Sequence, residues 1–249
     1  MTDNKRGSGP LSNNMLKILG AIFMVCDHAG VILFPKIEIL RTIGRLAFPI
    51  FAFLIAEGAK HTRNKLRHFL TMLSFAAAIQ LVYFIYDRSL EMSVLVTFTL
   101  SLMLIYATDD LKNAIFTKNT PPARIALASL AFISSVALAI FMDVTVDLDY
   151  GLSGCFLPLF PALLTAPKSE NTHASLKKLD SKLPRVLMTA LGTLALSLDY
   201  GGTQFFSLLA IPLLLLYSEK RGKLNMKYFF YIFYPLHIVA LYGISLLMK

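Results

Sequence analysis

Long apolar blocks alternate with short polar segments along the whole chain, and this pattern predicts membrane-spanning helices. The blocks approach the ~20 residues that a transmembrane helix needs, and they are apolar all round rather than striped at helical spacing. The predicted fold is therefore an all-α, polytopic transmembrane helix bundle. We expect about nine spans, near residues 15–35, 39–59, 69–86, 92–108, 124–142, 151–166, 185–198, 203–218 and 228–248.

The residues before the first apolar block have a different composition. Met1–Asn14 are polar and contain Gly, Ser, Asn and Pro, so we expect a disordered cytoplasmic tail. The block that follows is too long for a signal-peptide core and lacks a small-residue cleavage site. We therefore expect it to remain as the first span of a single transmembrane domain over residues 15–249.

The distribution of basic residues predicts the orientation of the spans. With the N-terminus placed in the cytoplasm, all lysines and arginines fall on the inner side except Lys36, Arg41, Arg45, Arg88 and Lys249. An excess of Lys and Arg in cytoplasmic loops is the usual bias in helical membrane proteins. We therefore expect a cytoplasmic N-terminus and an outer C-terminus.

The overall composition agrees with a membrane protein and argues against several other classes. Hydrophobic residues make up 56% of the chain and charged residues 16%, against about 45–50% and about 25% in a soluble domain. The net charge of +9 follows the predicted topology, and no nucleic-acid-binding motif accompanies it. The two cysteines lack metal-ligand spacing, and no Walker loop or HExxH motif is present. We therefore expect neither nucleic acid nor a bound metal ion.

Two adjacent titratable residues, Asp27 and His28, lie well inside the first predicted span. An aspartate near the bilayer centre costs roughly 2.5–3.5 kcal/mol on insertion scales, so it is rarely kept without a partner or a function. One interpretation is structural, with Asp27 in an ion pair and His28 hydrogen-bonded within the bundle. The alternative is a reaction site, since an unperturbed imidazole titrates near neutral pH and is a suitable general base.

Three further polar residues are predicted at similar depth. Arg41 and Arg45 open the second span a short hairpin after Asp27, so an ion pair between Asp27 and either arginine is geometrically reasonable. Adjacent helical residues point about 100° apart, so we expect Asp27 to hold an arginine while His28 faces a cavity. His237 lies near the middle of the last span, just after Pro235. These side chains could form one polar cluster, or several unrelated buried hydrogen bonds.

Four short segments occur together in this chain: Asp27-His28-Ala29, GRLAFPIFAF at 44–53, Tyr150-Gly151 with Gly154, and Phe233-Tyr234 with His237. In this order, and in a chain of this length, they resemble the TraX family of integral membrane acetyltransferases. The resemblance covers essentially the whole chain. The family is similar in plan to other multi-span acyltransferases that modify glycans.

The resemblance implies a multi-pass protein of the bacterial inner membrane that moves an acetyl group from cytoplasmic acetyl-coenzyme A to an acceptor. The acceptor could be a pilin N-terminal amine, a peptide, a lipid or a glycan, either embedded in the lipid bilayer or periplasmic. We expect His28 to act as general base, with Asp27 and His237 as further catalytic side chains. We expect Arg41 and Arg45 to contact the acetyl-coenzyme A, and Arg45 or His237 to stabilise the oxyanion.

Two other functions remain open from the sequence. A small proton-coupled transporter or flippase could use the same polar cluster, and a non-catalytic assembly factor could keep it for stability alone. The basic segments 60–67 and 219–227 could hold the phosphates of coenzyme A, although cytoplasmic loops are basic for topological reasons as well.

Overall fold

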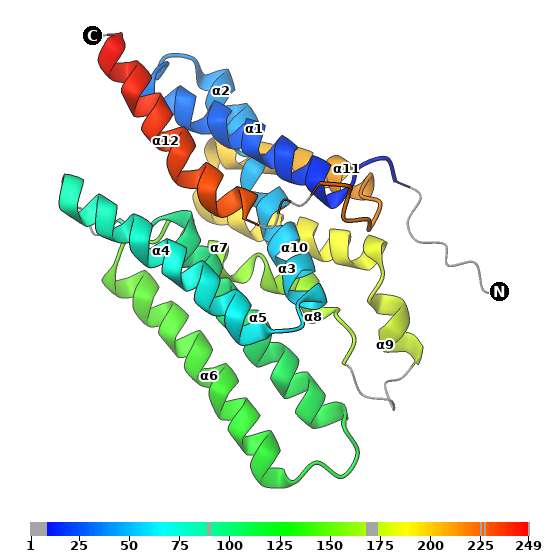
Figure 1. Ribbon diagram of the computed structural model, residues 1–249. Coiled ribbons are helices and arrows are strands. Elements are labelled where there is room, and N and C mark those ends of the chain that lie inside the picture. Colours follow the sequence, from blue (N-terminus) through cyan, green and yellow to red (C-terminus); the bar gives the residue numbers. More distant parts are fainter. Residues whose placement is uncertain (1–8, 89–90, 168–173, 225, 227, 249) are drawn as a thin grey trace. The chain divides into compact units, whose positions relative to one another are not determined.

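The structure is a computed structural model that describes residues 9–88, 91–167, 174–224, 226 and 228–248 (Figure 1). Helices account for nearly all regular structure in these ranges. Extended pairing there is restricted to two isolated bridges, Leu11 with Tyr217 and Met92 with Leu148. The predicted all-α bundle is thus confirmed.

Six helical segments of the described chain are long and apolar enough to cross a membrane, as expected for a multi-pass membrane protein. They are α1 (Asn13–Ile32), α2 with α3 (Glu38–His61), α4 from Lys65 to Ile85, α5 (Val94–Phe116), α6 (Pro122–Thr145) and α12 (Phe229–Leu247).

The other three predicted spans fall on shorter or less apolar helices. The span at 151–166 is divided into α7 (Gly151–Phe156) and α8 (Leu159–Leu163), with Pro158 between them. The span at 185–198 lies on α10 (Lys182–Tyr200). The span at 203–218 begins as a 3₁₀ helix, η1 (Gly202–Leu209), and continues as α11 (Ala210–Leu215).

Several helices extend beyond the predicted spans because charged residues continue them. The prediction began a loop at Asp109, whereas α5 continues to Phe116 with Asp109, Asp110 and Lys112 on its last turns. Likewise α4 begins at Lys65 rather than at residue 69, since the Asn64 side chain caps it by accepting a hydrogen bond from the Arg67 amide at 2.8 Å. Hydropathy marks where a helix leaves the apolar core, while capping marks where it ends.

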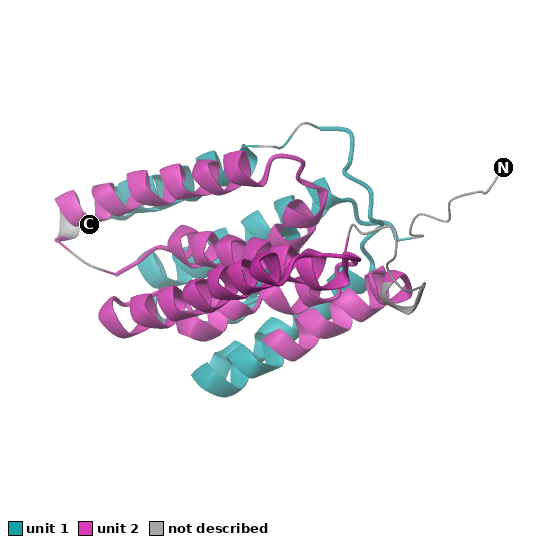
Figure 2. Cartoon of the chain, turned by 90° about the horizontal axis from the view of Figure 1, so that it is seen from below, with its two compact units in different colours: residues 1–54, 193–249 teal, residues 55–192 magenta. Residues whose placement is uncertain are grey.

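The chain forms two compact units, residues 1–54 with 193–249 and residues 55–192 (Figure 2). In the first unit, α1 packs against α2 and α12, and α2 packs against η1. These contacts place polar residues from the two ends of the sequence in one helix cluster.

The second unit is organised around α5, which packs against α4, α6, α7 and α8. Of its membrane-length helices α5 is the most buried, whereas α6 exposes large apolar side chains such as Leu130 (60%) and Phe141 (61%). An apolar exposed face of this kind suits contact with lipid. The short α9 (Ala174–Leu179) also belongs to this unit.

The predicted cytoplasmic tail lies partly outside the described residues, at 1–8. The remainder makes backbone hydrogen bonds to the segment before α12: Leu11 donates to Leu216 at 3.0 Å and Asn13 to Lys220 at 2.8 Å. Ser12 then caps α1 by accepting from the Met15 amide at 3.3 Å. Of the predicted basic inner segments, residues 168, 225 and 227 also lie outside the described residues.

Candidate active site

Asp27 lies between two arginines, as the hairpin spacing predicts. Its Oδ1 lies 3.6 Å from Nε of Arg41 and 3.7 Å from Nε of Arg45. The Asp27 and Arg45 side chains are 17% and 15% exposed, whereas Arg41 is 38% exposed. Arg45 is therefore the partner held inside the helix cluster, and Arg41 lies nearer its edge.

The close approach of α2 (Glu38–Gly44) to α1 depends on a glycine. A Cβ atom built on Gly44 would lie 2.3 Å from the Cβ of Asp27 and 2.5 Å from its Cα. Such distances are far below van der Waals contact, so any side chain at position 44 would force the helices apart. Gly44 thus allows Asp27 and the arginines to share one small volume.

His28 contacts His237 across the interface of α1 and α12. Nε2 of His237 lies 3.2 Å from Nδ1 of His28, and the two rings meet edge to face with centroids 4.8 Å apart. Phe233 stacks on the His237 ring at 4.9 Å between centroids and 7° between planes. His237 is buried and His28 is half-buried.

Backbone carbonyls determine which ring nitrogens carry protons in the neutral pair. Nδ1 of His237 lies 3.0 Å from the carbonyl oxygen of Phe233, and Nδ1 of His28 lies 2.9 Å from that of Met24. Because a carbonyl only accepts, we assign the proton of each ring to Nδ1, and the single Nδ1 hydrogen of His28 is then shared between the Met24 carbonyl and Nε2 of His237. This assignment leaves Nε2 of His28 with a lone pair, as a general base requires.

Gln204 also lies at the candidate site, although the sequence did not predict it. It lies on η1, where its Oε1 accepts a hydrogen bond from Nη1 of Arg45 at 3.4 Å, and it is 3% exposed. A glutamine between a glycine turn and an apolar helix carries no sequence signal of its own. Its role is visible only because η1 packs against α2.

Oδ1 of Asp27 and Nε2 of Gln204 are buried polar atoms of this site that have no hydrogen-bond partner within the described part of the chain. Oδ1 of Asp27 has ion-pair neighbours, but none at hydrogen-bond distance. Buried groups of this kind cost about 1–3 kcal/mol each when left unsatisfied, and native structures contain few of them. One acceptor and one donor, each next to Arg45, are the features expected of a site that receives a polar ligand.

The structure therefore brings together all five predicted residues within one unit: Asp27, His28, Arg41, Arg45 and His237. They form two contacts: the carboxylate of Asp27 with the two guanidinium groups, and the imidazole of His28 with that of His237. The two contacts are neighbours because Asp27 and His28 are adjacent in the sequence. Chemically, the arrangement offers one basic nitrogen, fixed positive charge and one unused amide donor. Their participation in catalysis remains a prediction.

Comparison with known proteins places the whole site inside a recognised family region. The profile of the TraX protein family matches residues 12–245. The chain is 25% identical over 247 residues to a protein of Dichelobacter nodosus described as probable fimbrial assembly protein FimC, serogroup H1, covering 91% of this chain and 92% of that protein. A shorter match, 48% identical over 40 residues and 16% of each chain, is to uncharacterized protein RP591 of Rickettsia prowazekii (strain Madrid E). No solved structure matches the chain significantly.

Proposed function

Because this chain belongs to the TraX family, we propose that it is an acetyltransferase of the bacterial inner membrane with acetyl-coenzyme A as its donor substrate. One observation carries the proposal. A histidine with an available Nε2 lone pair lies beside a carboxylate–guanidinium cluster that holds an unsatisfied acceptor and an unsatisfied donor. A base and preorganised positive charge are what acyl transfer from a thioester requires.

In the proposed reaction, an amine or hydroxyl of the acceptor attacks the carbonyl carbon of the acetyl thioester. Nε2 of His28 takes the proton that the nucleophile loses. The carbon–sulfur bond then breaks, and the thiolate leaves with the proton that His28 returns. His237 accepts the Nδ1 hydrogen of His28 and so orients its ring, which makes His237 a positioning residue.

The negative charge that develops on the carbonyl oxygen needs hydrogen-bond donors aimed at it. Arg45 supplies fixed positive charge, and Nε2 of Gln204 supplies an N–H that no described residue uses. Asp27 holds the Arg45 guanidinium in place. A single preorganised donor of this kind contributes about 10²- to 10³-fold in rate where it has been removed from other enzymes.

A pilin subunit is the acceptor that we propose to test first. The relative from Dichelobacter nodosus is described as a probable fimbrial assembly protein, and it matches this chain over nearly its full length. A pilin presents an N-terminal amine, which is a nucleophile once deprotonated. The neutral imidazole of His28 suits that deprotonation.

The test uses the full chain purified in detergent, radiolabelled acetyl-coenzyme A, and a synthetic peptide with a pilin N-terminus. We expect label on the peptide amine, and a loss of about 10²- to 10⁴-fold in His28→Ala, the range for removal of a general base. His61→Ala is the matched control, because His61 is 68% exposed at the end of α3 (Ala47–His61) and lies in the other unit.

Two results would contradict the proposal. Transfer at the unaltered rate in His28→Ala would remove this histidine as the base. Absence of acetyl transfer to any amine or hydroxyl acceptor, combined with proton-driven substrate flux in liposomes, would favour the transporter alternative.

A further inference from the structure

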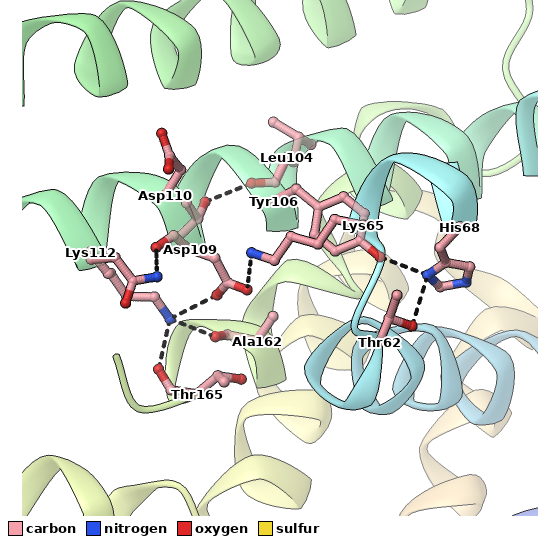
Figure 3. Close-up of polar contacts among 12 residues, drawn as sticks. Thr62, Lys65, His68, Leu104, Tyr106, Asp109, Asp110, Lys112, Ala162 and Thr165 are labelled. Carbon is pink, nitrogen blue, oxygen red and sulfur yellow. Dashed lines mark hydrogen bonds and ion pairs between the residues drawn. The ribbon is translucent and has the colours of Figure 1, made fainter. Parts of the chain in front are cut away.

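A second polar cluster lies in the unit formed by residues 55–192, where the ends of several helices meet (Figure 3). A small pocket there is lined by Lys60, Lys65, Asp109, Lys112, Asn113 and Thr165, which come from α3, α4, α5 and the segment after α8. We call it the lysine pocket. By the predicted topology, this end of the unit faces the cytoplasm.

The three lysines of the pocket have different roles. Lys112 is held by carbonyl oxygens, donating to Ala162 at 3.0 Å and to Thr165 at 2.8 Å, and it lies 3.5 Å from Asp109 (Figure 3). Those contacts use the three donors of its ammonium group. Lys112 therefore fixes the pocket wall rather than offering a hydrogen bond to a ligand.

Lys60 and Lys65 keep unused donors. Among the described residues, Lys60 donates one hydrogen bond, to Asp180 at 2.7 Å, and Lys65 donates one, to Asp109 at 3.1 Å. Each ammonium carries three N–H groups, so each has two left. Both side chains are partly buried, at 22% and 34% exposed, and both line the pocket.

The charge of the pocket is positive. Its lining contains three ammonium groups and one carboxylate, Asp109. The carboxylate of Asp180, which pairs with Lys60, still leaves an excess of positive charge. Partial burial reduces the screening of this charge by water and salt, so an anion is the ligand that the pocket favours.

The size of the pocket restricts the anion. Its volume is about 20 Å³, and roughly 10–15 Å³ is needed to hold one water molecule. This accommodates an oxygen of a terminal phosphate, seated at the mouth, and excludes a nucleotide base or an acyl chain. The free donors of Lys60 and Lys65 match phosphate oxygens, for which lysine is a common ligand.

We infer that the lysine pocket binds a phosphate monoester through Lys60 and Lys65, with Asp109 and Asp180 positioning the two ammonium groups. Two molecules could present this group: coenzyme A, through the 3′-phosphate of its ribose, and phosphatidic acid, through its headgroup. Assignment to coenzyme A rests on the proposed function, whereas recognition of the phosphate does not.

The experiment measures binding to the full chain in detergent with three probes: coenzyme A, 3′-dephospho-coenzyme A, and short-chain phosphatidic acid. Lys60→Gln and Lys65→Gln are compared with Lys178→Gln, a matched control on α9 whose side chain is exposed. We expect each pocket variant to bind coenzyme A about tenfold or more weakly, which is the effect of losing one hydrogen bond to a charged group. The affinity for 3′-dephospho-coenzyme A should not change. Lys60→Arg, which keeps the charge, should retain most of the affinity.

The outcomes separate this inference from the proposed function. If the pocket variants bind phosphatidic acid more weakly, and the unaltered chain does not bind coenzyme A, the phosphate pocket is supported and the acetyl-coenzyme A proposal is contradicted. A second result would show that the pocket does not bind the phosphate of acetyl-coenzyme A. In that result, the KM for acetyl transfer is the same for acetyl-coenzyme A and its 3′-dephospho form, and neither lysine variant changes it. Equal affinities of all variants for all three probes overturn the phosphate pocket entirely.

Discussion

His28 and His237, separated by 209 positions in the sequence, are in direct contact, with Nε2 of His237 3.2 Å from Nδ1 of His28. Their neighbours assign the protons: each Nδ1 faces a backbone carbonyl four residues earlier in its own helix. The pair therefore has a defined direction, in which His28 donates, His237 accepts, and Nε2 of His28 is the nitrogen left for chemistry.

The first prediction tests this direction with His237→Phe. A phenyl ring preserves the stacking on Phe233 and removes the acceptor nitrogen. We expect kcat for acetyl transfer to fall about tenfold, the effect of one lost hydrogen bond, with little change in KM. His237→Gln, whose carbonyl oxygen can accept, should recover part of the loss. Equal kinetics in the Phe variant and the unaltered chain would show that the contact does not orient His28.

The second prediction concerns the two arginines around Asp27. Both Nε atoms lie at similar distances from Oδ1, but Arg45 is 15% exposed and Arg41 is 38% exposed. Solvent screening weakens exposed ion pairs, so Arg45 should couple more strongly to Asp27. This can be measured by double-mutant cycles that combine Asp27→Asn with either Arg45→Gln or Arg41→Gln, followed by thermal unfolding in one detergent. The coupling free energy with Asp27 should be about 1 kcal/mol for Arg45 and smaller for Arg41. The reverse order would contradict the burial argument.

The third prediction concerns the approach of α1 and α2. Gly44→Ala places a Cβ within 2.3 Å of Asp27, so the helices must separate. We expect a loss of about 1–3 kcal/mol of stability, typical of overpacking, together with reduced acetyl transfer. Gly243→Ala on α12 is the matched control, because nothing lies within 4 Å of its built Cβ. A Gly44→Ala protein as stable and active as the control would show that the close approach is dispensable.

The fourth prediction concerns the buried amide of Gln204. Gln204→Leu removes the amide donor that no described residue uses, and with it the oxygen that accepts from Arg45, so the rate should fall about 10- to 100-fold and stability by about 1 kcal/mol. Gln80→Leu should lose stability to a similar extent but keep the rate. Gln80 donates to Glu91 at 3.0 Å and accepts from Ser93 at 3.4 Å, so its loss costs stability and spares the rate. Similar rates in both variants would exclude Gln204 from the site.

Much of the helical arrangement is predictable because hydropathy acts locally. A continuous apolar block must satisfy its own backbone hydrogen bonds in a bilayer, and the helix is the structure that does so. The same local reasoning places Asp27 and His28 on the first span and Arg45 a short hairpin away. Helix ends are less predictable, since caps such as Asn64 and terminal residues such as Lys112 act outside the apolar core.

By itself, the sequence determined the helical class, the positions of the apolar segments, and which polar residues lie within those segments. Only the tertiary structure decided which of those residues meet. Three examples join separate segments of the chain: His28 contacts His237, Arg45 donates a hydrogen bond to Gln204, and Lys60 and Lys65 line the same pocket. Such contacts depend on how helices pack against one another, including close approaches such as the one at Gly44, which has no side chain. The hydrophobic periodicity of one segment does not reveal which other segment packs against it.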